Sequence, residues 1–121
     1  MVLDSNICIT YLNGDDTVIG ALPQWKEQNT ALLVSSIAIT EVLSYPALAS
    51  DEIADAKSFL SGFISIPFDD ALAEVAALVR RMYRVELPDA AIAATALNRN
   101  LPLVTRDRQF KKIKELAVID L

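Results

Sequence analysis

The sequence predicts a single α/β domain spanning residues 1–121, with three layers (α/β/α) around a central, mainly parallel sheet of five strands. Three observations lead to this fold class. Short apolar segments alternate with helical segments along the whole chain, with no repeat or linker between them. Apolar residues make up 53% of the sequence, and Gly and Pro number only 3 and 5, which is typical of one well-packed core. Acidic residues directly follow two of the apolar segments, where parallel strands place ligand-binding groups.

Five short segments are expected to be strands. In chain order they are Val2–Leu3, Ala31–Ser35, Phe63–Pro67, Leu103–Thr105 and Ala117–Asp120. They are continuously apolar at their centres rather than alternating with polar residues. This pattern indicates strands that are buried on both faces, as in a parallel sheet covered by helices.

Six helical segments are expected between these strands. The first helix is expected to begin after Ser5 or Asn6, and the fifth, a long one, at Asp69 or Asp70. The other four are expected at Asp15–Gln28, Ile37–Ser44, Ser50–Gly62 and residues 87–99. Asn13-Gly14 and Pro46 are expected to end two of them, whereas Pro23 makes the continuity of the second uncertain. In the long helix the spacing places one set of side chains toward the core: Leu72, Val75, Ala76, Val79, Met82 and Tyr83.

The last of these helices is almost entirely apolar and should be buried. Pro88 suits its first turn, where a missing N–H costs nothing. Asp89 is the only acid in the first turn. A carboxylate at a helix N-terminus interacts favourably with the helix dipole, so a purely structural role explains Asp89 as well as a chemical one does.

Missing residue types exclude several classes of function. The chain has no His, which excludes a Ser-His-Asp triad and a Cys-His pair and argues against zinc or copper sites. Any metal would have to be a hard cation held by carboxylates, such as Mg²⁺ or Mn²⁺. The lone Cys8 cannot form an internal disulfide, and neither a signal peptide nor a membrane-spanning segment is apparent, so a cytoplasmic protein without membrane association is expected.

The net charge of −5 conceals an asymmetry between the two parts of the chain. Residues 1–79 carry two Lys against eleven acids, whereas residues 80–121 carry nine Lys or Arg against five acids. The overall acidity argues against a general nucleic-acid binder. The basic part leaves room for phosphate contacts, although solvated helix faces would explain it equally well.

Four acids stand out by position. Asp4 and Asp107 each follow an apolar strand, Glu41 lies within an apolar helix, and Asp89 begins another. Capping, a turn or a solvent-facing position would explain each of them singly. Together at one edge of the sheet they would repel one another, and one or two divalent cations would relieve that repulsion. Such a site suits hydrolysis of phosphodiesters by a metal-activated water.

Four stretches of the sequence resemble the motifs of the PIN-domain nucleases, and most closely those of VapC-type toxins of prokaryotic toxin–antitoxin pairs. They occur in the family's order and are Met1–Asn6, Ile39–Leu43, Leu87–Leu97 and Thr105–Phe110. None is specific by itself, but the four together are. The resemblance covers the whole chain.

The resemblance implies a PIN-like fold and an endoribonuclease that depends on Mg²⁺ or Mn²⁺, bound as one or two ions. It implies that Asp4, Glu41, Asp89 and Asp107 bind the metal and act in catalysis. The polar side chains that support them in the family correspond to Asn6 and Thr105. The partners it implies are an RNA substrate, a VapB-like antitoxin and a second copy of the chain in a homodimer.

The fourth stretch departs from the family pattern. Many relatives carry Asn in the place of Arg106 and a further acid in the place of Gln109, so Asp107 is the only acid here. A second metal would then bind weakly or only together with substrate. One of Arg106 and Arg108 is a candidate for contacting a substrate phosphate, the alternative being a pair of exposed arginines.

Two other functions are compatible with the same residues. One is an RNA-processing PIN nuclease without an antitoxin. The other is a non-catalytic α/β binding module such as a signalling receiver domain. Receiver domains need paired acids after the first strand and a Lys after the last, and the sequence has neither.

Overall fold

The computed structural model describes all residues, 1–121, and its centre is a five-stranded sheet in the order β3-β2-β1-β4-β5. Every neighbouring pair is parallel, so the sheet is wholly rather than mainly parallel, and the expected α/β class is confirmed. All five strands lie within the segments expected from the sequence, and four are shorter than expected. Their bounds are Val2–Leu3 (β1), Leu33–Ser35 (β2), Ile64–Ile66 (β3), Leu103–Val104 (β4) and Val118–Ile119 (β5).

All six expected helices are present. They are Ser5–Leu12 (α1), Asp16–Glu27 (α2), Ser36–Leu43 (α3), Ile53–Leu60 (α4), Asp70–Tyr83 (α5) and Leu87–Asn98 (α6), with short 3₁₀ turns at Ser50–Glu52 (η1) and Arg108–Lys112 (η2). Pro23 lies inside α2 and does not interrupt it. None of the helices is both long enough and apolar enough to cross a membrane.

The N-caps of α1 and α3 are the residues that end the preceding strands. Asp4 caps α1, which is the capping role left open for this acid, while the expected start after Ser5 or Asn6 is wrong by one or two residues; Ser35 caps α3. The strand in each case runs into the helix without a spacer. The residue that leaves the strand therefore has extended backbone and a side chain free to accept from the first turn, which is the geometry of an N-cap.

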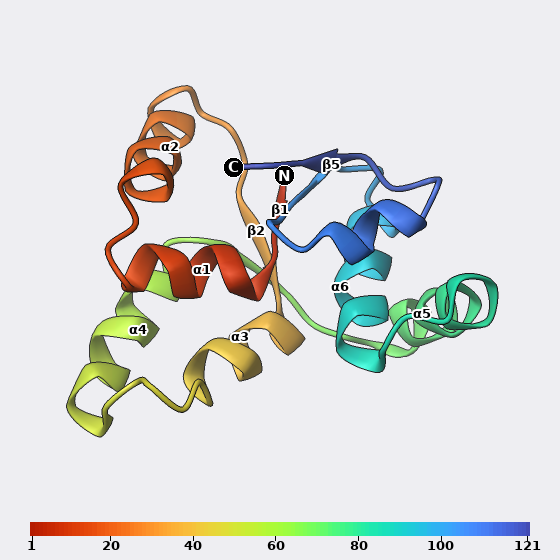
Figure 1. Cartoon of the computed structure of the whole chain (residues 1–121), viewed down its shortest axis with the longest axis horizontal. Coiled ribbons are helices and arrows are strands. Elements are labelled where there is room, and N and C mark those ends of the chain that lie inside the picture. Colours follow the sequence, from red (N-terminus) through yellow and green to blue (C-terminus); the bar gives the residue numbers. More distant parts are fainter.

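The sheet separates two apolar cores. Val2 and Leu3 are consecutive in β1 and pack into different cores, because successive side chains of a strand point to opposite faces. Figure 1 shows α5 and α6 on one side of the sheet and α1, α2 and α4 on the other. Helices thus cover both faces, which gives the three layers expected from the sequence.

Helix α6 is the most deeply buried helix of the fold. Seven consecutive residues, 90–96, are buried on all sides of the helix. Because α6 is fixed by this packing, the side chains at its first turn start from a rigid platform.

Helix α5 packs against α6, and the core position predicted for one residue of α5 is wrong. Leu72, Ala76 and Val79 are buried as expected, but the Met82 side chain is 65% exposed. Tyr83 follows Val79 by four residues and continues the inward stripe, so Met82 falls on the flank that faces solvent.

Candidate active site

The carboxyl edge of the sheet brings the first and fourth motifs together. Strands β1 and β4 are direct neighbours, and the Asp4 backbone N–H donates to the Val104 carbonyl at 3.0 Å. Asp4 leaves β1 at this edge, and Asp107 follows β4 by three residues. Asp4 and Asp107 therefore follow adjacent strands at the same edge of the sheet.

Asp4 is buried and held at both of its oxygens. Asp4 as a whole residue is only 4% exposed. Oδ1 accepts from the Ser5 backbone N–H at 2.8 Å, and Oδ2 accepts from the Thr105 hydroxyl at 2.7 Å. The carboxylate is thereby fixed in one orientation before any ligand arrives.

The Thr105 hydroxyl connects three parts of the site. It donates to Asp4 and accepts from the Asp107 backbone N–H at 3.0 Å and from Asn6 Nδ2 at 3.4 Å. Thr105 is fully buried. Asn6, Thr105 and Asp4 are thus joined by hydrogen bonds, and a supporting role for Asn6 and Thr105 stays a prediction.

Asn6 leaves one buried acceptor without a partner. Its Oδ1 is the only buried side-chain nitrogen or oxygen in the chain that makes no hydrogen bond. An unpaired buried polar atom costs free energy, about 1–3 kcal/mol, unless a ligand or water supplies a donor. The atom therefore points to a further polar group at this position.

Glu41 reaches the site from α3, and Ser5 positions it. The Ser5 hydroxyl donates to Glu41 Oε1 at 3.0 Å, which links the helix after β1 to the helix after β2. From the sequence, Ser5 was expected only as a possible helix cap. No local pattern relates two residues that are 36 positions apart, so this role was missed.

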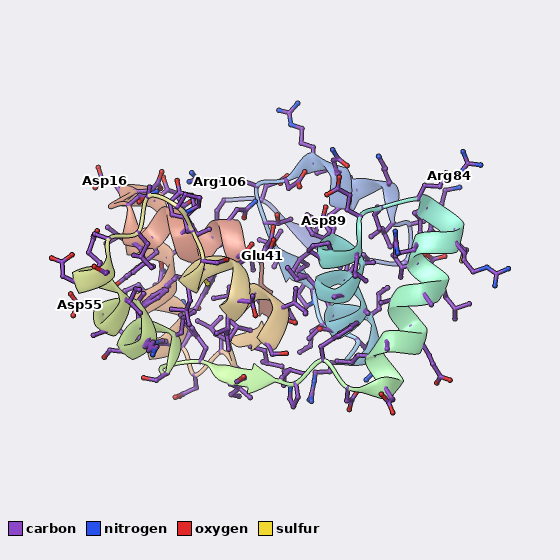
Figure 2. All side chains as sticks on the ribbon, turned by 90° about the horizontal axis from the view of Figure 1, so that it is seen from below. Asp16, Glu41, Asp55, Arg84, Asp89 and Arg106 are labelled. Carbon is purple, nitrogen blue, oxygen red and sulfur yellow. The ribbon has the colours of Figure 1, made fainter.

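Asp89 and Asp107 complete the set. Asp89 lies in the first turn of α6, and Asp107 caps η2, with its Oδ1 accepting from the Gln109 N–H at 2.9 Å. Figure 2 shows Glu41 and Asp89 near each other at the middle of the molecule, whereas Asp16 and Asp55 lie at its far end.

Burial and mutual repulsion change the acidity of two of these carboxyl groups. Burial, and to a smaller extent the charges of Asp89 and Glu41, raise the pKa of Asp4 to about 6 against the hydrogen bonds from Thr105 and Ser5. Burial, followed by the charges of Asp107, Glu41 and Glu86, raises the pKa of Asp89 to about 6. Asp4, Glu41, Asp89 and Asp107 therefore belong to one electrostatic cluster.

The donor set fits a hard divalent cation in its chemistry. In this conformation no group of three or more Asp, Glu, Cys or His side chains has the geometry of a metal-binding set. The groups that gather here are all oxygen donors, their charges repel one another, and Asn6 Oδ1 lacks a partner. Mg²⁺ and Mn²⁺ prefer such ligands, and Mg²⁺ commonly keeps several waters beside one or two carboxylates.

The two candidate phosphate-binding arginines are placed differently. Arg106 donates from both Nη atoms to the Asp15 carboxylate, at 3.0 and 3.1 Å, and from Nε to the Leu121 carbonyl at 2.9 Å. The Arg106 guanidinium holds the pKa of Asp15 below its usual value. Arg108 is exposed and forms no ion pair, so it is the freer of the two.

The comparisons with known proteins decide the family. The family model described as PIN domain matches residues 1–116. The chain belongs to the PIN domain family. PIN domains are nucleases, so an enzymatic role is supported.

Several solved structures share the fold over nearly their whole length. A chain of a toxin–antitoxin complex from Klebsiella pneumoniae is 30% identical, with a TM-score of 0.83 and coverage of 98% of this chain and 94% of that one. A chain of DNA-bound VapBC from Salmonella typhimurium is 25% identical (TM-score 0.83; coverage 98% and 96%). A chain of VapBC2 from Rickettsia felis bound to promoter DNA is 23% identical (TM-score 0.86; coverage 99% and 97%). No curated protein sequence matched the chain.

Proposed function

We propose that this PIN protein is a metal-dependent endoribonuclease that hydrolyses RNA phosphodiesters. The observation that carries the proposal is the electrostatic cluster of Asp4, Glu41, Asp89 and Asp107 at the carboxyl edge of the sheet. Burial and the neighbouring negative charges raise the pKa of Asp4 and of Asp89 to about 6, so their ionised forms are held there at a cost to the fold. A bound cation would offset that cost and supply the chemistry.

In this proposal the four acids hold one or two Mg²⁺ or Mn²⁺ ions. When bound, the metal lowers the pKa of a water nucleophile and neutralises charge that develops on the phosphate. The chain itself supplies orientation: Thr105 holds Asp4, and Ser5 holds Glu41. Asn6 Oδ1 is a buried acceptor that a bound water would satisfy. Arg108, rather than the paired Arg106, is the better candidate for a substrate phosphate.

The proposal predicts that cleavage of RNA requires both a divalent cation and Asp89. Wild-type protein should cleave RNA in Mg²⁺ or Mn²⁺ and lose this activity in EDTA. Asp89→Asn should lower the rate about 100-fold, because the half-buried carboxylate no longer carries charge toward the cation. Gel analysis of labelled RNA measures both effects.

A matched control is Asp55→Asn, which neutralises an exposed acid of α4 far from the cluster and should leave the rate unchanged. Cleavage that persists in EDTA and in Asp89→Asn would contradict the proposal. Absence of cleavage by wild-type protein in Mg²⁺ and in Mn²⁺, with RNA still bound, would favour a binding module.

We further propose that the chain is the toxin of a VapBC-type pair and acts in the cytoplasm. The support is the 30% identical toxin–antitoxin chain and the VapBC structures that share the fold. Its only Cys is buried and unpaired, which agrees with a reducing compartment. Exposed Leu78, Met82 and Leu87 side chains are compatible with a homodimer.

The toxin proposal predicts inhibition by a partner. A small protein encoded beside this chain should co-purify with it and suppress RNA cleavage, because an antitoxin that covers the site excludes substrate. Comparing the rate for the co-expressed complex with that for the isolated chain measures the effect. An equal rate in both preparations would instead favour an RNA-processing nuclease without an antitoxin.

A further inference from the structure

Three arginines gather where α5 ends. Arg80 and Arg81 lie in the last turn of α5, and Arg84 is its C-cap. Together with Ala77 and Val85 they line a shallow hollow of about 500 Å³. All three arginines are exposed.

None of the three arginines forms an ion pair, although the chain has 16 acids and a net charge of −5. The two ion pairs of the fold use Arg106 and Lys111 instead. Arg80 Nε donates to the Val85 carbonyl at 3.4 Å, which steadies its side chain and leaves both Nη groups available. Glu86 is the only acid between Glu74 and Asp89, and it does not neutralise the arginines.

Arg84 occupies a backbone conformation that its residue type disfavours. Four residues of the chain have positive φ, and the other three are Asn29, Asn100 and Gly14, the types that accept it easily. Arg84 has φ 55° and ψ 36°, where Gly or Asn would be more stable by about 1 kcal/mol. The strained backbone at Arg84 indicates that its side chain has a function that offsets the loss of stability.

The arginines lie close to the catalytic acids along the chain and in space. Asp89 follows Arg84 by five positions, so their Cα atoms are at most about 18 Å apart. Figure 2 shows Asp89 toward the middle of the molecule, at the start of α6, and Arg84 at the outer end of α5 on the α6 side of the molecule. A strand of nucleic acid with one phosphate at the acids reaches the arginines within a few nucleotides.

We infer that Arg80, Arg81 and Arg84 form a phosphate-binding subsite that holds the RNA strand beside the scissile bond. The inference rests on the proposed function and names where the substrate lies. The acid cluster repels the flanking phosphates of a polyanion, so productive binding needs positive charge next to it. Arginine suits this role because its planar fork donates to two phosphate oxygens at once.

Binding of a fluorescent single-stranded RNA of random sequence, measured in EDTA at several salt concentrations, tests the subsite. The variant is Arg81→Gln with Arg84→Asn, which keeps the Arg80 bond to Val85 and places Asn where positive φ favours it. Its Kd should rise about tenfold at low salt. The slope of log K against log salt should fall by about 1.4, since each phosphate contact of a single strand contributes about 0.7.

The matched control is Arg99→Gln with Lys57→Gln, which removes the same charge. Arg99 is the C-cap of α6, about 18 Å along that helix from its start, and Lys57 is exposed on α4. This control should change Kd less than threefold. In Mg²⁺ the test variant should raise KM with little change in kcat, because the arginines hold the strand outside the reacting bond.

If the test variant has the same Kd and salt slope as the control, the proposed phosphate-binding subsite is wrong. The arginines would then be candidates for binding an acidic segment of a protein. Loss of RNA binding in the test variant, in a protein whose wild type cleaves no RNA, would support the subsite while contradicting the proposed nuclease. The two failures are therefore distinguishable.

Discussion

Replacing Asp4 by Asn should lower RNA cleavage about 1,000-fold or more while the protein stays folded. Asp4 is the most buried acid of the cluster and the only one with both oxygens held by hydrogen bonds. Removal of its charge weakens cation binding directly. Rates measured in Mg²⁺ for wild type and variant test the expectation.

The fold should survive this change because Asn is as good an N-cap as Asp. Its side-chain oxygen can still accept from the Ser5 N–H at the start of α1. Asp16→Asn, in the exposed first turn of α2, is the control, and it should cleave at the wild-type rate. A fully active Asp4→Asn protein would mean that the buried acid serves the fold alone.

The second large effect concerns stability, and its sign follows from the raised pKa values. Asp4 has a pKa of about 6 in the folded chain, against about 3.9 in an unfolded one. The folded state therefore binds this proton more tightly. The resulting stability is fully present below pH 4 and is lost as the pH rises through 6.

In EDTA we expect the free energy of unfolding of the wild type to fall, relative to Asp4→Asn, by about 1–1.5 kcal/mol between pH 5 and pH 7.5. Asp89 shifts in the same direction. At pH 7.5 a cation at 100 times its Kd should restore about 2.7 kcal/mol to the wild type. Urea unfolding at the two pH values, with and without Mg²⁺, measures both quantities.

Asp4→Asn should lack the part of the loss with pH that Asp4 contributes, keep the part that Asp89 contributes, and show little of the gain with Mg²⁺. A wild type whose stability is the same at both pH values would mean that Asp4 is ionised at no cost. A gain in Mg²⁺ that is equal in both proteins would place the cation away from Asp4.

The sequence predicted the parts of the structure that depend on local pattern. Continuous apolar segments predicted strands buried on both faces, and the Ala-rich stretch predicted the buried α6. An acid within three residues of the end of each of two apolar segments predicted that Asp4 and Asp107 lie at the same edge of the sheet. That step needed β1 and β4 to be neighbours, and they are.

Side-chain pairing across the fold was beyond the sequence. The Ser5–Glu41 bond spans 36 positions, and the Arg106–Asp15 pair spans 91. Such pairs depend on where whole helices are packed, which no local spacing encodes. Even the cap of α1 moved from Ser5 or Asn6 to Asp4, because the site acid itself ends the strand.

The Thr105 hydroxyl has a consequence for synthesis of the chain. Its bond to Asp4 joins residues 101 positions apart, and β1 obtains its β4 partner only when residues 103–104 exist. A nascent chain that stalls before this point carries three of the four acids but lacks Asp107 and the hydroxyl that holds Asp4. Unfinished copies released from a ribosome should therefore be inert, and harm to the producing cell, if this is a toxin, is confined to chains that are nearly complete.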